Sequence, residues 1–239
     1  MNILSKLTLE SRKKQFGKLK TEYGINEMKN RNELIAFVTN PKQMDGVDID
    51  EDEYGDLNGP PSLIACRMND FELFQLLISL GAKEDVVYDG ITLYDGICAW
   101  SSNIDFFKYL NEKGFDFKNE TKWGTTPFLC VVNQLGYEDH KKNENEKNQF
   151  TKLLEIYSYL IGNGVDINDG GKGAPSPLMK ASERNSIFLI KDLLQKGVDA
   201  RKKYFLEEIE KEMNCLEYYR FRLKETDSVE NMKVIELIS

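Results

Sequence analysis

Apolar residues recur along this chain at the three-to-four residue spacing of amphipathic helices. In FELFQLLISL (71–80), Leu73, Leu76, Leu77 and Leu80 follow the i, i+3, i+4, i+7 pattern. Shorter stretches rich in small residues, such as LIACRM and LMKASE, precede such stripes, and a glycine and polar turn residues follow them. The pattern predicts pairs of short helices, the second ending at a glycine in the left-handed C-cap conformation.

The predicted helix pairs repeat with a period of about 33 residues. Similar endings (LLISLGAKED, YLNEKGFDFK, YLIGNGVDIN and LLQKGVD) place glycines at positions 81, 114, 164 and 197, and MDGVDID at 44–50 is a weaker copy. A pair of this length cannot bury its apolar faces alone, so the repetition predicts a stack of neighbouring pairs.

One gap between these glycines is longer, because an insertion at 136–151 separates the two helices of one copy. It begins GYEDHKKNENEKNQF and is rich in Asn, Lys and Glu. Surface loops tolerate such growth, since the entropic cost of closing a loop rises slowly with its length. The sequence therefore predicts a polar loop there.

The repeats resemble ankyrin repeats. The starts WGTTPFL (123–129), SPLMKA (176–181) and DGIT (89–92) and the ends GVDIN (164–168) and GVDA (197–200) are similar to the motifs of that family. The resemblance covers about residues 54–200, with a degenerate copy at about 31–53. It implies an all-α fold, an ankyrin-repeat α-solenoid with helical N- and C-terminal caps. The motif's histidine is replaced by other residues, which removes a hydrogen bond between neighbouring loops and predicts looser loops; the replacements are Leu63, Asp95, Leu129 and Met179.

Three regions follow from this reading. Residues 1–53 hold N-terminal capping helices with the degenerate first repeat, 54–200 hold four copies, and 201–239 form a C-terminal helical cap. Within the cap, apolar spacing predicts one amphipathic helix across 205–223. It predicts a second helix after an Asp227 N-cap, with the stripe Val229, Met232, Ile235 and Ile238. The alternative is a partner-binding or dimerising helix pair that uses Tyr218, Tyr219 and Phe221.

Composition narrows the class of protein. The net charge of −8 disfavours nucleic acids and anionic membranes and suits a basic partner. No apolar run approaches the roughly 18 residues that span a bilayer. The basic N-terminus, residues 1–20, lacks the apolar core of a secretory signal, and a targeting or lipid-touching helix is the alternative to a capping helix there. The cysteines follow the repeat rather than a ligand pattern, which predicts reduced thiols and a cytoplasmic protein; they are Cys66, Cys98, Cys130 and Cys215.

Candidate chemistry is sparse. His140, the single histidine, lies in the polar insertion rather than in a rigid frame, as a catalytic triad or zinc site requires. The acidic run 45–56 has Glu53 and Gly59 where a calcium loop needs glycine and glutamate, so a solvated loop is favoured over weak cation binding. DGGKGAPS (169–176) does not fit the phosphate-loop pattern. The sequence predicts no enzyme, no cofactor and no metal.

The resemblance implies protein binding at hairpin tips and at the exposed side of each first helix. Both tryptophans fall on this surface, and interface hot spots are rich in Trp, Tyr and Arg. For Trp100, packing under the neighbouring repeat is the alternative. Carried over by position, the expected contact residues are Arg67, Met68, Tyr88, Asp89, Trp100, Lys122, Trp123, Asn133, Gln134, Lys172, Glu183 and Arg184.

These features predict a non-catalytic module, a monomer on its own, that binds one protein partner and inhibits or scaffolds it. Abundant Asn, Lys and Ile indicate an AT-rich genome, typical of a microbe or its virus. An immunity protein that neutralises a basic toxin is one version, since acidic charge steers basic partners. The alternative is a secreted bacterial or viral effector that binds a host protein. An enzyme would need a site in the insertion or the C-terminal helices.

Overall fold

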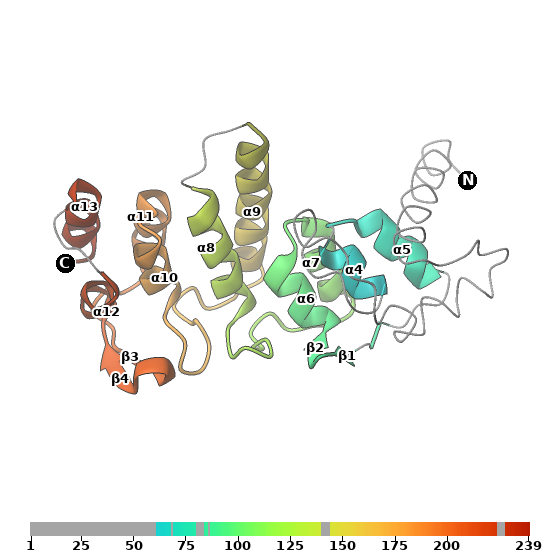
Figure 1. The fold of residues 1–239 in the computed structure, drawn as a ribbon, viewed down its shortest axis with the longest axis horizontal. Coiled ribbons are helices and arrows are strands. Elements are labelled where there is room, and N and C mark those ends of the chain that lie inside the picture. Colours follow the sequence, from blue (N-terminus) through green and yellow to red (C-terminus); the bar gives the residue numbers. More distant parts are fainter. Residues whose placement is uncertain (1–60, 68, 80–83, 86, 140–143, 224–227) are drawn as a thin grey trace. The chain divides into compact units, whose positions relative to one another are not determined.

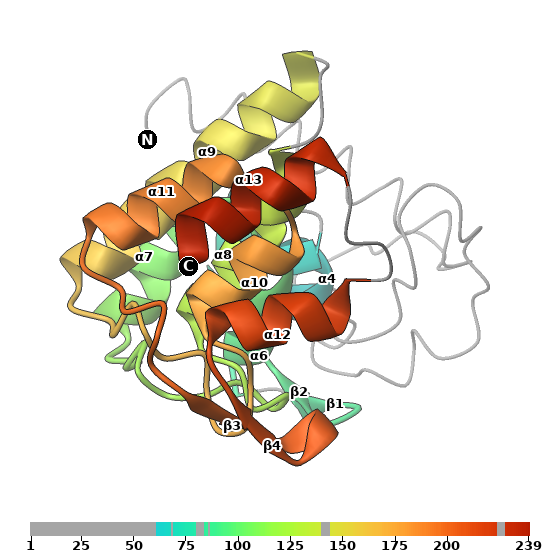
Figure 2. The same ribbon diagram turned by 90° about the vertical axis from the view of Figure 1, so that its left-hand side faces the viewer.

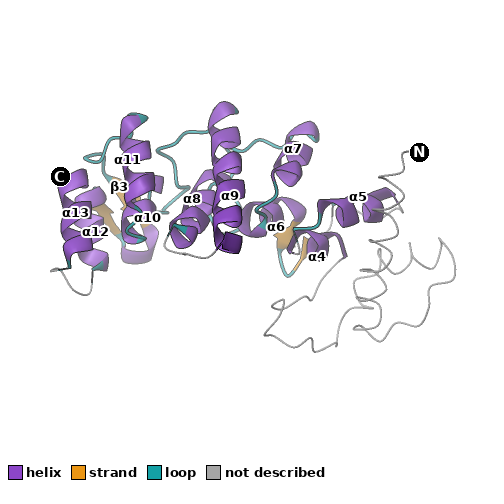
Figure 3. Cartoon of the chain, turned by 90° about the horizontal axis from the view of Figure 1, so that it is seen from above, coloured by secondary structure: helices purple, strands orange, loops and turns teal. Residues whose placement is uncertain are grey.

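The computed structural model describes residues 61–67, 69–79, 84–85, 87–139, 144–223 and 228–239, which are mostly helical (Figures 1 and 3). The chain divides into two compact units, 1–106 and 107–239. The predicted N-terminal cap, the degenerate copy at 31–53 and the acidic run at 45–56 lie outside the described residues. No helix in the described ranges combines the length and apolar character needed to cross a membrane.

The first unit contains helix pairs of the predicted kind. Its elements are α4 (Pro61–Arg67), α5 (Phe71–Ser79), β1 (Val87–Tyr88), β2 (Ile91–Thr92), α6 (Leu93–Trp100) and the start of α7 (Ile104–Glu112). Helix α4 packs against both α5 and α6. Phe71, Phe74 and Phe106 meet ring to ring in the core, with centroid separations of 5.1–6.0 Å. Strands β1 and β2 form an antiparallel hairpin in the loop before α6.

The second unit stacks three helix pairs in chain order. Its elements after α7 are α8 (Pro127–Glu138), α9 (Glu144–Gly162), α10 (Pro177–Glu183), α11 (Ile187–Gln195), β3 (Tyr204–Leu206), the short 3-10 turn η2 (Glu207–Ile209), β4 (Lys211–Met213), α12 (Cys215–Arg222) and α13 (Val229–Ile238). Helix α10 packs between α8 and α12, and α11 packs against α13. The first helices of the pairs form one layer and the second helices another (Figure 2).

Polar residues begin the first helix of each of four pairs. Thr92, Thr126, Ser176 and Asn214 are the N-caps of α6, α8, α10 and α12, and each side chain accepts the backbone N–H three residues on. Such caps satisfy a backbone donor that has no partner within the helix. Thr126 and Ser176 are the residues directly before proline in the repeat starts Thr-Thr-Pro and Ser-Pro.

Glycine ends the second helices, as predicted. Gly114, Gly164 and Gly197 follow α7, α9 and α11 with φ of +81°, +77° and +88°. One residue later, the N–H of Phe115 donates to Leu110 at 3.0 Å, and that of Val198 donates to Leu193 at 3.1 Å. This is the Schellman arrangement, which satisfies the last helical carbonyls.

The insertion at 136–151 is helical rather than a polar loop, where it is described. Helix α8 runs to Glu138 and α9 begins at Glu144, so the insertion lengthens both helices. The insertion is rich in Glu, Lys and Asn and contains no proline. It can therefore extend a helix that starts in the packed part of the repeat. The turn residues 140–143, with His140, lie outside the described residues.

The C-terminal segment differs from the prediction of one helix across 205–223. Residues 204–213 form the antiparallel hairpin β3–β4, and α12 begins only at Cys215. Asn214 and Glu217 cap each other's backbone N–H groups, which starts a new helix at this point. The fold is therefore mostly helical, but the described residues also include two short hairpins.

Helix α13 buries only part of the predicted stripe: Ile238 is buried and Ile235 is half-buried. Its N-cap is Ser228, and Asn231, Val234 and Ile238 are buried, whereas Val229 and Met232 are 73% and 58% exposed. The spacing of apolar residues did not predict this face, because the polar residue Asn231 faces inward. Asn231 accepts hydrogen bonds from the Tyr219 hydroxyl and the Asn185 amide.

Candidate partner-binding surface

The loops before α8 and α10 carry the predicted tip residues of the second unit, and they are joined directly. The Thr126 N–H donates to Gly170 O, and its hydroxyl donates to Asp169 O, both at 2.9 Å. The Lys172 N–H donates to Glu120 Oε1 at 2.5 Å. Backbone groups thus link neighbouring loops where the family motif uses histidine, so the loss of that histidine does not leave these two loops unconnected.

A glycine allows the two loops to approach this closely. A Cβ at Gly171 would lie 2.1 Å from Gly124 O, and the φ of Gly171 is +110°, a region that side-chain-bearing residues rarely adopt. The loop that carries Trp123 therefore packs against the loop that carries Lys172.

Trp123 stands out on this tip because 46% of it is exposed. Lys122 Nζ lies 5.4 Å from the centroid of its ring, within cation–π range. With Lys172 exposed on the adjacent tip, the structure brings three of the predicted contact residues onto neighbouring loops.

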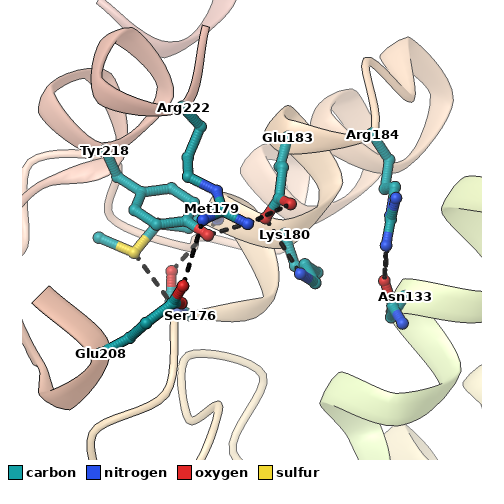
Figure 4. A network of polar contacts seen from close by, with 9 residues as sticks. All are labelled: Asn133, Ser176, Met179, Lys180, Glu183, Arg184, Glu208, Tyr218 and Arg222. Carbon is teal, nitrogen blue, oxygen red and sulfur yellow. Dashed lines mark hydrogen bonds and ion pairs between the residues drawn. The ribbon is translucent and has the colours of Figure 1, made fainter.

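Arg184, at the end of α10, contacts α8 (Figure 4). Its Nε and Nη2 donate to Asn133 Oδ1 at 3.1 and 2.9 Å. Its guanidinium carbon lies 3.6 Å from the centroid of the Tyr137 ring. Asn133 and Arg184, which the sequence offered as separate partner contacts, therefore bind each other.

Glu183 lies at the centre of a second network (Figure 4). Its Oε2 accepts from the Tyr218 hydroxyl at 2.7 Å and from Lys180 Nζ at 3.0 Å. Its Oε1 accepts from Arg222 Nη2 at 3.1 Å, and Arg222 Nη1 lies 3.5 Å from Glu208. The carboxylate thus ties α10 to α12.

These contacts shift the ionisation of Glu183 and its partner. Burial opposes ionisation of the Glu183 carboxyl, but hydrogen bonds from Tyr218, Lys180 and Arg222 outweigh it and bring its pKa down to about 2. Burial, followed by the hydrogen bond to Glu183, raises the pKa of Tyr218 well above its usual value. A carboxylate held ionised by three donors acts as a structural anion rather than as a general acid or base at neutral pH.

The remaining predicted contacts have mixed environments. Tyr88 is half-buried in β1, and Asp89 is exposed in the turn of that hairpin. Gln134 on α8 is half-buried, the Arg67 side chain lies outside the described part of the structure, and Met68 does so entirely.

Trp100 packs on its own helix. A Cβ at Gly96 would lie 2.9 Å from the Trp100 ring and 3.0 Å from the Leu63 side chain. The half-buried ring therefore occupies the space that Gly96 leaves open on the same helix.

Sequence reasoning missed Tyr137, which is 52% exposed. It lies four residues after Asn133, so the two share a helix face once α8 is seen to continue into the insertion. Tyr218 and Tyr219 are buried and donate hydrogen bonds inside the unit, so of the aromatics in the alternative C-terminal helix pair they are not exposed contacts. Phe221, the third aromatic of that set, is exposed.

The cysteines behave as small apolar residues. All four are free thiols; Cys130 is half-buried and the others are buried. Burial raises the pKa of Cys66, and it raises that of Cys215 to about 11, so neither resembles a reactive thiolate. Within the described ranges, no group of three or more His, Cys, Asp and Glu residues is placed to hold a metal ion.

The described helix pairs have polar N-caps on their first helices and left-handed glycines after α7, α9 and α11. No family model matches the chain. The chain is similar to Ankyrin repeat protein OPG189 of Variola virus, with 30% identity over 163 residues, and the same values hold for the protein from a human isolate of that virus. The similarity covers 61% of this chain and 28% of the viral protein. It confirms the predicted resemblance to ankyrin repeat proteins.

Proposed function

We propose that this chain is a non-catalytic binding module that recognises one protein partner through the loops and first helices of its repeats, as an ankyrin-repeat solenoid does. The observation that carries the proposal is the tip in which Trp123, with Lys122 beside it, adjoins Lys172. A half-exposed tryptophan on rigid, hydrogen-bonded loops loses little entropy on binding, and Trp is enriched at interface hot spots.

The networks behind this tip support the same proposal. Arg184, Asn133 and Tyr137 hold one another in a fixed arrangement on α8 and α10, and such preorganisation lowers the cost of binding. Glu183 belongs to the frame that holds α12 rather than to the contact set.

The test compares the unaltered chain with Trp123→Ala in pull-downs from lysates, with each bound protein quantified. We expect the partner to be captured by the unaltered chain and lost with the variant, while Tm changes little. The matched control is Trp100→Phe, which we expect to keep the partner and lower Tm, because this ring fills the space beside Gly96. Equal capture by unaltered chain and Trp123→Ala would contradict the proposal.

Two versions of the proposed function differ in the partner. In both, the chain inhibits or scaffolds that partner in the cytoplasm. The similarity to a viral protein supports an effector that binds a host protein. The net charge of −8 supports the immunity version, in which the partner is a basic toxin. Capture of a partner from eukaryotic cell lysate would support the effector version. The immunity version predicts a basic bacterial protein as the partner.

A further inference from the structure

Within the described ranges the hairpin β3–β4 has no third strand, so both of its outer edges lack a strand partner. On the β3 side, the Glu207 N–H donates to Gly173 O of the preceding loop at 2.9 Å. On the other side, no strand in the described ranges pairs with β4 apart from β3. An unpaired strand edge offers N–H and C=O groups to an added strand.

Packing holds this hairpin firmly in place. A Cβ at Gly173 would lie 2.2 Å from the Glu207 side chain, and β4 packs against α12. Leu206 is buried, whereas Phe205, its neighbour in β3, is 53% exposed. The hairpin therefore has one face on the protein and one face in solvent.

The register identifies the residues at the open edge. Leu206 pairs with Lys211 beside the turn, and Phe205 pairs with Glu212. Antiparallel pairs alternate between those that exchange hydrogen bonds and those that do not. The Glu207 N–H donates to Gly173 O and so points away from β4. Because successive N–H groups alternate in direction, we infer that the Leu206 N–H faces β4 and that Leu206 and Lys211 are a bonded pair. The backbone N–H and C=O of Glu212 then point to the outer edge of β4.

We propose that the open edge of β4 accepts an extended segment of a protein partner with an arginine or lysine opposite Glu212. Glu212 and the nearby Glu210 are exposed and carry the charge that such a side chain complements.

A second copy of this chain is a poor occupant of the edge. Antiparallel pairing of two β4 strands about their central residue would set Glu212 against Glu212, and directly opposed like charges destabilise a sheet. The proposed surface is distinct from the Trp123 tip, so it goes beyond the function proposed above.

The experiment uses the full chain and a fluorescein-labelled nine-residue peptide of alternating arginine and valine. Fluorescence anisotropy measures its Kd, and a matched peptide has glutamate in place of arginine. We expect the arginine peptide to bind at least about tenfold more tightly than the glutamate peptide. Arginine opposite Glu212 attracts its carboxylate, whereas glutamate at the same position repels it. Glu212→Gln should weaken the arginine peptide, and Trp123→Ala should leave its Kd unchanged.

Backbone pairing is tested separately from charge. N-methylation of the arginine residues removes the N–H groups that face the edge, and we expect binding to be lost. N-methylation of the valine residues leaves these donors in place and is the matched control. Glu212→Pro removes the edge N–H in the protein, and proline is tolerated at edge strands where the N–H faces solvent. Circular dichroism and Tm check that this variant stays folded.

Several results would overturn the proposal. The first is that the arginine peptide does not bind. The second is that the glutamate peptide, or both N-methylated peptides, bind as tightly as the arginine peptide. The third is a concentration-dependent dimer of the chain that Glu212→Lys changes. Loss of peptide binding in Trp123→Ala would also overturn it, since the peptide would then occupy the Trp123 tip. Failure of the peptide test leaves the Trp123 pull-down unaffected, so the two proposals fail independently.

Discussion

The guanidinium of Arg184 lies over the ring of Tyr137, 3.6 Å from its centroid, while the same group donates twice to Asn133. The stem of Arg184 lies against Gly136, the residue just before Tyr137 on α8. One arginine of α10 thus meets three positions on the neighbouring helix. Cation–π contacts of this kind contribute about 0.5–2 kcal/mol, depending on how far the pair is desolvated.

Adding a methyl group at Gly136 should break this contact. A Cβ there would lie 2.7 Å from both Cβ and Cγ of Arg184, atoms close to the backbone that cannot move far. We expect Gly136→Ala to lower the free energy of unfolding by about 1–3 kcal/mol, as overpacking does. Thermal and urea unfolding measure the loss.

The same substitution at Gly162 is the matched control. Gly162 is the last residue of α9, and apart from its chain neighbours and the backbone of its own helix, no atom lies within 4 Å of a Cβ built there. Alanine should be neutral or add up to about 1 kcal/mol at that position, from its higher helix propensity. Equal destabilisation by the two variants would mean that the α8–α10 contact has no special role.

Glu183 should make stability depend on pH in the acid range. Its pKa in the folded chain is about 2, below the ordinary value of 4.5, so its contribution is present above pH 4.5 and is lost as the pH falls toward 2. The shift corresponds to at most about 3 kcal/mol. Urea unfolding of the unaltered chain and Glu183→Gln should differ most near pH 7, and the curves should converge at low pH.

The control for this experiment is Glu236→Gln, an exposed position on α13. Removing that charge should change stability by less than about 0.5 kcal/mol at any pH, as surface substitutions usually do. A gap between unaltered chain and Glu183→Gln that stays constant from pH 7 to pH 2 would contradict the assigned ionisation of Glu183.

Repetition made the helix pairs between 61 and 200 predictable, because period, cap residues and glycines all point to one arrangement. Gly114, Gly164 and Gly197 take the predicted left-handed conformation because a helix end there satisfies its carbonyls locally. Local signals of this kind can be read from a single sequence.

The features that the sequence did not predict depend on contacts between residues far apart in the chain. Asn231 faces inward because Tyr219 and Asn185 provide hydrogen bonds, and no periodicity of apolar residues can show this. The insertion became helix because α8 and α9 continue from packed turns. Glu183 and Arg184 lie at the end of α10, but their pairing with Tyr218 and Asn133 depends on neighbours about 35 to 51 residues away, which no local pattern shows.

Thiol labelling should distinguish the four cysteines. Cys130 is half-buried and the other three are buried, and thiolate formation is further opposed at Cys66 and Cys215 by their raised pKa. We therefore expect one thiol to react quickly with a maleimide at pH 7, and three to react only on opening. Mass spectrometry of the labelled peptides should assign the fast site to Cys130.

Cys130→Ser provides the control for labelling. This variant should lose the fast phase and keep the slow ones. If a fast phase persists in Cys130→Ser, one of the other thiols is accessible in the folded chain, and the packing described for α4, α6 or α12 is wrong at that cysteine.

The closeness of the two tip loops predicts a difference between two glycines of positive φ. Gly164→Ala should cost about 1 kcal/mol from backbone strain alone, since no atom lies within 4 Å of its Cβ position. Gly171→Ala adds a clash with Gly124 O and should cost at least about 2 kcal/mol more. In a Trp100→Phe background, Gly171→Ala should also shift the fluorescence of Trp123, which is carried by the loop that must move. Equal Tm losses in the two variants, with unchanged emission, would mean that these loops do not hold the tip in place.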